Sequence, residues 1–134
     1  MSLTLGYFSK FPAAYKEREK LVNDVIFTEI TYNKSEDQKI LVNSRTNKYF
    51  QEMEIEGETI NLHANVKVFC SCESFKYEFA NSIFKSGSLK RPISFIRSII
   101  SRPKQKNEHN IPSGCKHIVA LSRKIIKIKI NRSQ

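Results

Sequence analysis

All three cysteines of this 134-residue chain stand in two short motifs, and this arrangement constrains the fold more than any other feature. Cys70 and Cys72 form a Cys-x-Cys pair, and Cys115 and His117 form a Cys-x-His pair after the long segment 73–114. Three thiolates and one imidazole are a complete ligand set for tetrahedral Zn²⁺ and leave no open position for a reactive water. The four residues therefore predict a structural zinc site.

Core thiols are the alternative interpretation of these cysteines. Free cysteine is among the most buried residue types, so three thiols need not bind a metal. A disulfide framework is unfavourable, because the cysteine count is odd and the two residues of a Cys-x-Cys pair are badly placed to bond each other. His63 and His109 lie outside the motifs and are expected to be ordinary solvated or packed residues, although His109 could replace His117 as a ligand.

The two motifs, with Phe75 after the first and an apolar helix-like run after the second, resemble the SWIM-type zinc finger. The pattern of that family is Cys-x-Cys, a variable spacer and Cys-x-His. The resemblance covers about residues 64–126 and implies a module that interacts with nucleic acid or protein, with zinc bound by Cys70, Cys72, Cys115 and His117. Because the spacer is longer than is usual in the family, we expect an insertion at about 86–113. The cysteine-rich string also resembles small SWIM-containing proteins of large tailed bacteriophages.

The first half of the chain predicts a helix followed by a β-meander. Pro12 is suited to the first turn of a helix over about 12–23. Alternating and β-branched residues predict strands over 25–32, 39–44, 48–56 and 65–69, while 58–62 is ambiguous and 1–11 is a short strand or an extended arm. Short turns between consecutive strands favour antiparallel pairing.

The second half of the chain predicts helices around the two metal motifs. Helical spacing covers 73–85, a short helix could begin at Pro92, and another is expected after Cys115 to about residue 127. The fold class is therefore α+β, in one domain spanning 1–134. Its expected parts are 1–63 (helix and meander), 64–126 (zinc module with the insertion) and a basic tail at 127–134.

Two further patterns have both a structural and a functional interpretation. The glutamates at alternate positions 52–58 are expected to form the solvent face of a strand, although paired carboxylates can also bind a hard cation or act in acid–base chemistry. The apolar stripe of Phe75, Phe79 and Ile83 is expected to be core, although exposed aromatic rings can stack on bases.

Positive charge is confined to the C-terminal part of the chain. The formal net charge is +10, yet residues 1–84 hold 10 Lys and Arg against 12 Asp and Glu, a net of −2, and residues 85–134 hold 13 against one, a net of +12. Such a field attracts polyanions. The candidate phosphate-binding residues are Lys90, Arg91, Arg97, Arg102, Lys104, Lys106, Lys116, Arg123, Lys124 and Lys127.

These features favour a non-enzymatic binding protein. The chain has no glycine-rich phosphate loop and no serine nucleophile motif, and its cysteines are assigned to the metal. The first hypothesis is a zinc-stabilised module that binds nucleic acid, DNA in preference to RNA, mainly through phosphates; no small-molecule substrate is expected. The alternative is a structural subunit of an assembly such as a virion. With neither a membrane-spanning apolar run nor a secretory signal, we expect an intracellular protein.

Overall fold

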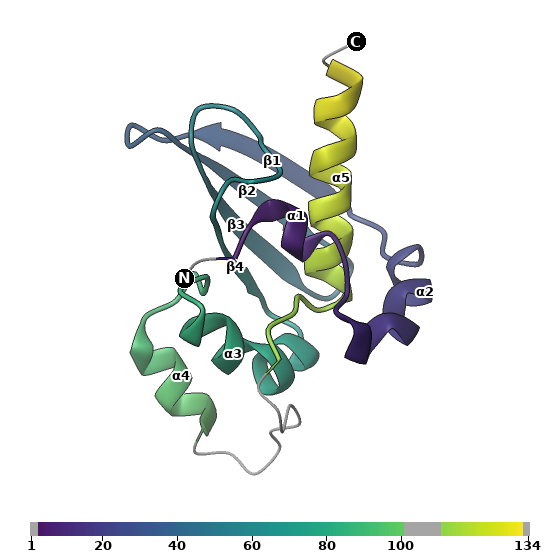
Figure 1. Ribbon diagram of the computed structural model, residues 1–134, viewed down its shortest axis with the longest axis vertical. Helices are drawn as coiled ribbons and strands as arrows, with labels where there is room; N and C mark the ends of the chain where they lie inside the picture. Colours follow the sequence, from purple (N-terminus) through teal and green to yellow (C-terminus); the bar gives the residue numbers. More distant parts are fainter. Residues whose placement is uncertain (1–2, 101–110, 133–134) are drawn as a thin grey trace.

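A four-stranded antiparallel sheet forms the centre of the computed structural model, which describes residues 3–100 and 111–132 (Figure 1). The strands follow one another across the sheet in chain order: β1 (Glu29–Lys34), β2 (Lys39–Arg45), β3 (Phe50–Glu56) and β4 (Val66–Cys70). Helices precede and follow the sheet. The predicted α+β class and antiparallel meander are therefore confirmed.

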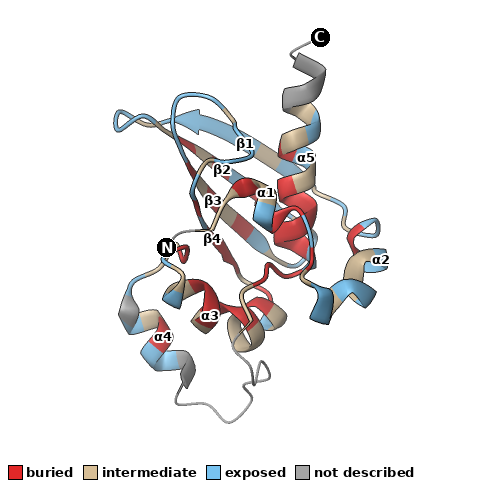
Figure 2. Cartoon of the chain, in the orientation of Figure 1, coloured by how far each residue is buried: buried red, intermediate tan, exposed pale blue. Residues whose placement is uncertain are grey.

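The two faces of the sheet differ as the alternation predicts. On β3, Gln51, Met53 and Ile55 are buried and face the core, in register with buried residues of β2 and β4 (Figure 2). Glu52 and Glu54 point to the other face, where Glu52 pairs with Lys90 and Arg91 and Glu54 pairs with Lys39. The strand therefore presents a core side and a charged side, as expected for a half-buried sheet.

The N-terminal segment differs from the predicted strand or extended arm, because residues 5–8 are helical. Only the start is extended, where the Val66 N–H donates to the Leu3 carbonyl (3.0 Å). Helix α1 (Leu5–Phe8) follows at once, since the Thr4 hydroxyl accepts a hydrogen bond from the Tyr7 N–H (3.1 Å) and caps it. Burial of Leu5 and Phe8 attaches the short helix to the core.

The predicted helix 12–23 is present in two shorter parts. A 3₁₀ segment, η1 (Ala13–Arg18), contains the non-helical residue Tyr15, and one α-helical turn, α2 (Glu19–Val22), follows. The Tyr15 ring packs edge-on against Phe79 (ring centroids 5.0 Å apart), so a tertiary contact fixes this irregular backbone. Strand β1 begins at residue 29 rather than 25, and 58–62 is not a strand.

In the described part of the chain, four helical segments follow the sheet. They are η2 (Phe75–Phe79), which is a π-helical turn, α3 (Ala80–Lys85), α4 (Ile93–Ile100) and α5 (Lys116–Arg132). The last helix begins two residues earlier than the expected apolar run and ends beyond the predicted residue 127. No helix in the described ranges is both long and apolar enough to cross a membrane.

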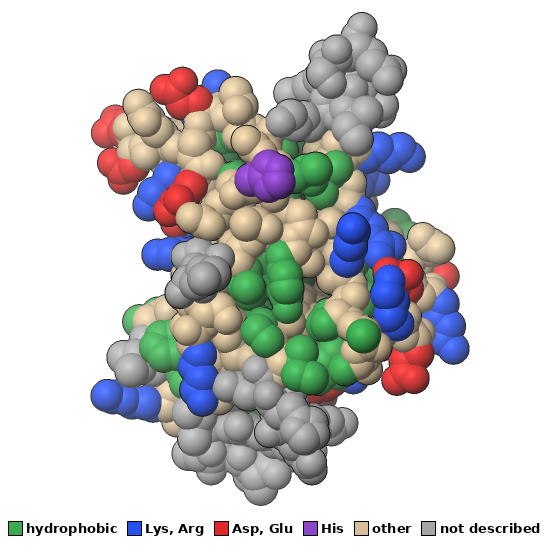
Figure 3. All heavy atoms as spheres, viewed as in Figure 1, with side chains coloured by type: hydrophobic (Ala, Val, Ile, Leu, Met, Phe, Trp, Pro, Cys, Tyr) green, Lys and Arg blue, Asp and Glu red, His purple; other side chains and the backbone are tan. Residues whose placement is uncertain are grey.

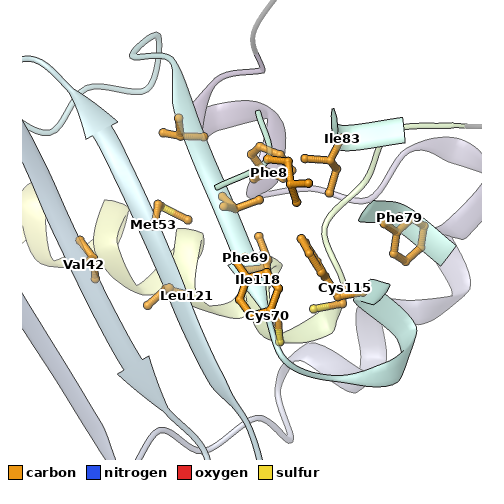
Figure 4. Packing of buried hydrophobic residues seen from close by; sticks show 14 of the residues in the cluster. Phe8, Val42, Met53, Phe69, Cys70, Phe79, Ile83, Cys115, Ile118 and Leu121 are labelled. Atoms are coloured by element: carbon orange, nitrogen blue, oxygen red, sulfur yellow. The ribbon is translucent and has the colours of Figure 1, made fainter. Parts of the chain in front are cut away.

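One hydrophobic cluster joins the sheet to these helices. Phe75, Phe79 and Ile83 are fully buried, so the core interpretation of this stripe is confirmed. Residues of α5, among them Ile118 and Leu121, belong to the same buried cluster and lie beside the sheet (Figure 4). The core thus continues directly from the meander into the segment that carries the cysteines.

The outer edge of β4 is covered by the chain that follows α3. The Val68 N–H donates to the Ser88 carbonyl (2.8 Å), and the Lys90 N–H donates to the Val68 carbonyl (2.9 Å). This short parallel contact satisfies backbone groups that an edge strand would otherwise leave open. It also holds the start of the predicted insertion beside the first cysteine pair.

Candidate metal centre

The two cysteine motifs, distant in the sequence, meet in a single buried cluster. Cys70 ends β4, Cys72 lies just before η2, Cys115 precedes α5 and His117 is in the first turn of α5. One ligand atom from each residue lies within 4.8 Å of all the others, and all four residues are buried. The predicted ligand set is therefore brought together.

The spacing of the cluster fits a tetrahedral metal. His117 Nδ1 lies 3.7 Å from the Cys70 Sγ and 3.9 Å from the Cys115 Sγ. Tetrahedral zinc with Zn–S near 2.3 Å and Zn–N near 2.0 Å requires ligand atoms about 3.5–3.8 Å apart. These residues could hold one metal ion with little rearrangement, and a full shell of four would leave no site on it for a substrate.

Local structure orients the ligands and supplies positive dipoles to the sulfur atoms. The backbone N–H of Phe75 donates to the Cys72 Sγ (3.4 Å), because the helical turn begins directly after that cysteine. His117 is held close to the cysteines by the first turn of α5, whose N-terminal end carries a positive partial charge. Both features favour thiolates over thiols.

A buried glutamine that sequence reasoning did not include among the site residues also reaches the cluster. Gln51 is paired with Cys70 across β3 and β4, and its Nε2 lies 3.6 Å from the Cys70 Sγ. Its Oε1 accepts a hydrogen bond from the Ser44 hydroxyl (2.7 Å), which orients the amide. The sequence feature that could have indicated this role is the polar Gln51 at an inward-facing position of β3, where the neighbouring inward residues are apolar.

The thiols differ in how readily they lose a proton. Hydrogen bonds from the Cys115 and Cys70 thiols lower the pKa of Cys72, whereas burial raises the pKa of Cys115 well above its ordinary value. At Cys70 a hydrogen bond from Cys115 lowers the pKa, but the hydrogen bond with Cys72 and burial outweigh it and raise the pKa to about 12. Without metal, the cluster thus favours one thiolate, at Cys72, and two thiols.

The residues predicted to contact phosphate fall into three groups. Arg97, Lys116, Lys124 and Lys127 are exposed. Lys90, Arg91 and Arg123 are partly buried and make contacts within the chain. Arg102, Lys104 and Lys106 lie outside the described residues, as does His109, whereas His63 is exposed in the turn before β4 and is not part of the cluster.

Two of the arginines have structural partners. The Arg91 guanidinium lies over the Phe69 ring (3.8 Å to the centroid) and forms an ion pair with Glu52 (2.5 Å). Arg123 donates to the Ser9 carbonyl (2.7 Å) and pairs with Glu19 (3.0 Å), which connects α5 to the N-terminal segment. Arg91 and Arg123 are therefore paired within the fold, although the sequence alone predicted that they contact phosphate.

Comparison with protein-family models, with curated proteins and with solved structures found no match to this chain. The geometry described above is therefore the basis for assigning the site. It is a buried Cys₃His cluster compatible with zinc.

Proposed function

We propose that this chain is a non-enzymatic, SWIM-type zinc module that binds nucleic acid. The observation that carries the proposal is the buried cluster of Cys70, Cys72, Cys115 and His117, whose ligand atoms lie within 4.8 Å of one another. Thiolates and imidazole favour zinc over hard cations, which prefer oxygen ligands. Zinc-bound thiolates also suit a reducing compartment, in keeping with an intracellular protein.

The metal would act by holding separate parts of the chain together. Its ligands come from the end of β4, the start of the following helical turn and the start of α5. Because the unfolded chain has no preformed site, the free energy of zinc binding would stabilise the folded state. The closed shell assigns zinc a structural role and leaves binding to the protein surface.

The proposed partner is nucleic acid because of where the exposed cations lie. Lys116, Lys124 and Lys127 are exposed on α5, and Lys124 and Lys127 lie one helical turn apart. Figure 3 shows Lys and Arg side chains beside α5 and α2, with Asp and Glu side chains among those near α2. A surface of this kind would bind phosphates, with DNA as the first partner to test and RNA as the second.

The proposal is tested by metal analysis and by binding at several salt concentrations. We expect one zinc per chain by mass spectrometry, and binding of a labelled DNA duplex whose affinity falls steeply with salt. The double variant Lys124→Ala/Lys127→Ala should reduce the slope of log affinity against log salt by about two, because each lysine neutralises roughly one phosphate.

A matched control has the same change in charge at another place. Lys34→Ala/Lys67→Ala removes two exposed lysines from strands β1 and β4 and should leave the slope unchanged. Zinc binding without any affinity for DNA or RNA would refute the nucleic-acid part of the proposal and favour the alternative, a structural subunit of an assembly. A chain without zinc would refute the module itself.

A further inference from the structure

Two hollows in the protein surface adjoin the metal cluster, and His117 lines both of them. Each has a volume of about 290 Å³, and they share Tyr49, Lys116 and His117. One hollow also reaches Cys72 and Cys115, while the other is bounded by residues 24–26 and by the turn between β2 and β3. We name the second one the His117 hollow; its lining includes Asp24, Ile26, Lys48, Tyr49, Lys116 and His117.

The rim of the His117 hollow carries two lysines that the fold does not use. Lys48 and Lys116 are exposed, and neither has an ion-pair partner within residues 3–100 and 111–132. Among the described residues that line the hollow, Asp24 is the single carboxylate. Two ammonium groups against one carboxylate favour an anionic group such as a phosphate.

Apolar surface lies beside these lysines. Ile26 is 77% exposed, the largest value among the exposed large hydrophobic residues, so it contributes little to the core. The Tyr49 ring packs against the His117 ring at 5.3 Å, which places an aromatic side chain next to the metal ligand. An aromatic ring and an aliphatic side chain beside a phosphate site are what a nucleotide base can stack on.

The backbone around Tyr49 already holds this arrangement. The Thr46 N–H donates to the Tyr49 carbonyl (2.8 Å), and the Tyr49 N–H donates to the Thr46 hydroxyl (3.2 Å). The turn that presents Lys48 is therefore closed by hydrogen bonds between Thr46 and Tyr49. Binding would need less ordering of the chain, and so would lose less free energy, than binding to a flexible loop.

We propose that the His117 hollow binds one nucleotide of a single-stranded nucleic acid, with its phosphate between Lys48 and Lys116 and its base against Tyr49 and Ile26. The inference rests on the proposed function and adds where and in which form the nucleic acid binds. A single strand can turn a base into the hollow, whereas the bases of an intact duplex stay stacked in the helix. A metal-bound His117 would form the floor of the His117 hollow.

The experiment compares a labelled single-stranded oligonucleotide with a duplex of the same sequence, using the zinc-loaded full chain. Single-strand binding should be the tighter of the two, and Ile26→Ala should weaken it by about fivefold to tenfold, because the base would have less apolar surface to pack on. Lys48→Ala should lower the salt slope for the single strand by about one. Neither variant should change zinc content, since neither residue is a ligand or a core residue.

Control variants make the same chemical changes away from the hollow. Leu62→Ala removes an apolar side chain that is 48% exposed, and Lys34→Ala removes an exposed lysine on β1; both should bind as the wild type does. Equal binding of single strand and duplex, with no effect of Ile26→Ala, would overturn the inference and leave the proposed function in place through the lysines of α5. Absence of binding to any nucleic acid would overturn both.

Discussion

Gln51 and Cys70 face each other across β3 and β4, and the glutamine Nε2 lies 3.6 Å from the cysteine Sγ. The Gln51 side chain is fully buried, and its other end accepts a hydrogen bond from Ser44. A buried amide is costly unless both ends have partners. Here one partner is a candidate metal ligand, so the sheet and the cluster depend on each other.

Gln51→Leu should therefore weaken both metal binding and stability. We expect zinc affinity to fall by about 10-fold to 100-fold, as is typical when a hydrogen bond to a metal ligand is removed. The free energy of unfolding should fall by about 1–3 kcal/mol, because the Ser44 hydroxyl loses its partner. Competition with a chromophoric chelator and urea unfolding measure the two effects. Ser44→Ala keeps the amide and should cost less affinity; an unchanged affinity in Gln51→Leu would contradict this role.

Removal of the metal should loosen the connection between the sheet and α5. Because the ligands come from the end of β4, the segment just after it and the start of α5, a chelator should lower the thermal unfolding temperature, and added Zn²⁺ should restore it. Cys115→Ser should abolish this response. His63→Ala, which changes an exposed histidine outside the cluster, should keep one zinc and full response to the chelator. Equal melting curves with and without chelator would show that the fold does not depend on metal.

Zinc affinity should rise with pH, because zinc displaces protons from the thiols. The raised pKa values of Cys70 and Cys115 keep both protonated near neutral pH, whereas the lowered pKa of Cys72 makes it a thiolate already. Binding should thus release about two protons from the cysteines, and log affinity should rise by about two per pH unit near neutrality. Affinity measured at several pH values tests this; a slope near three would mean that Cys72 is protonated as well.

Gly114 precedes the second metal motif and has no room for a side chain. A Cβ there would lie 2.8 Å from Ile118 Cγ2 and 3.3 Å from Phe8 Cδ1. Gly114→Ala should lower the free energy of unfolding by about 1–3 kcal/mol through overpacking. Urea unfolding with saturating zinc measures it, and the cost should shrink in an Ile118→Ala background, which removes the Cγ2 atom. Costs that add independently in the double variant would rule out the contact with Ile118 Cγ2 as the cause.

Arg91 should behave as a structural residue rather than a phosphate contact. Its guanidinium lies over Phe69 and pairs with Glu52, and both charged side chains are partly exposed. Arg91→Ala should lower the free energy of unfolding by about 1 kcal/mol, with little change in the salt slope for DNA. Lys116→Ala is the comparison: it should leave the free energy of unfolding nearly unchanged and reduce the salt slope for DNA. If Arg91→Ala has wild-type stability and a clearly reduced salt slope, Arg91 is a phosphate contact rather than a structural residue.

By itself, the sequence determined the ligand set and the order of the strands. Cysteine and histidine at short spacings define a metal site through their own chemistry, and alternation along β3 defines its two faces before any neighbour is known. Both properties are local. The helix over 12–23 was only partly predictable, because the backbone at Tyr15 depends on its contact with Phe79.

Only the tertiary structure decided which polar and charged side chains are free for function. Glu19 lies against Arg123, and Glu52 lies against Arg91, although neither pair is close in the sequence. Pairing across such distances depends on strand register and helix packing, which composition does not contain. For the same reason, the sequence located the cysteines of the candidate metal centre but not the contact of Gln51 with Cys70. It also assigned Arg91 and Arg123 to phosphate binding, although both form ion pairs within the fold.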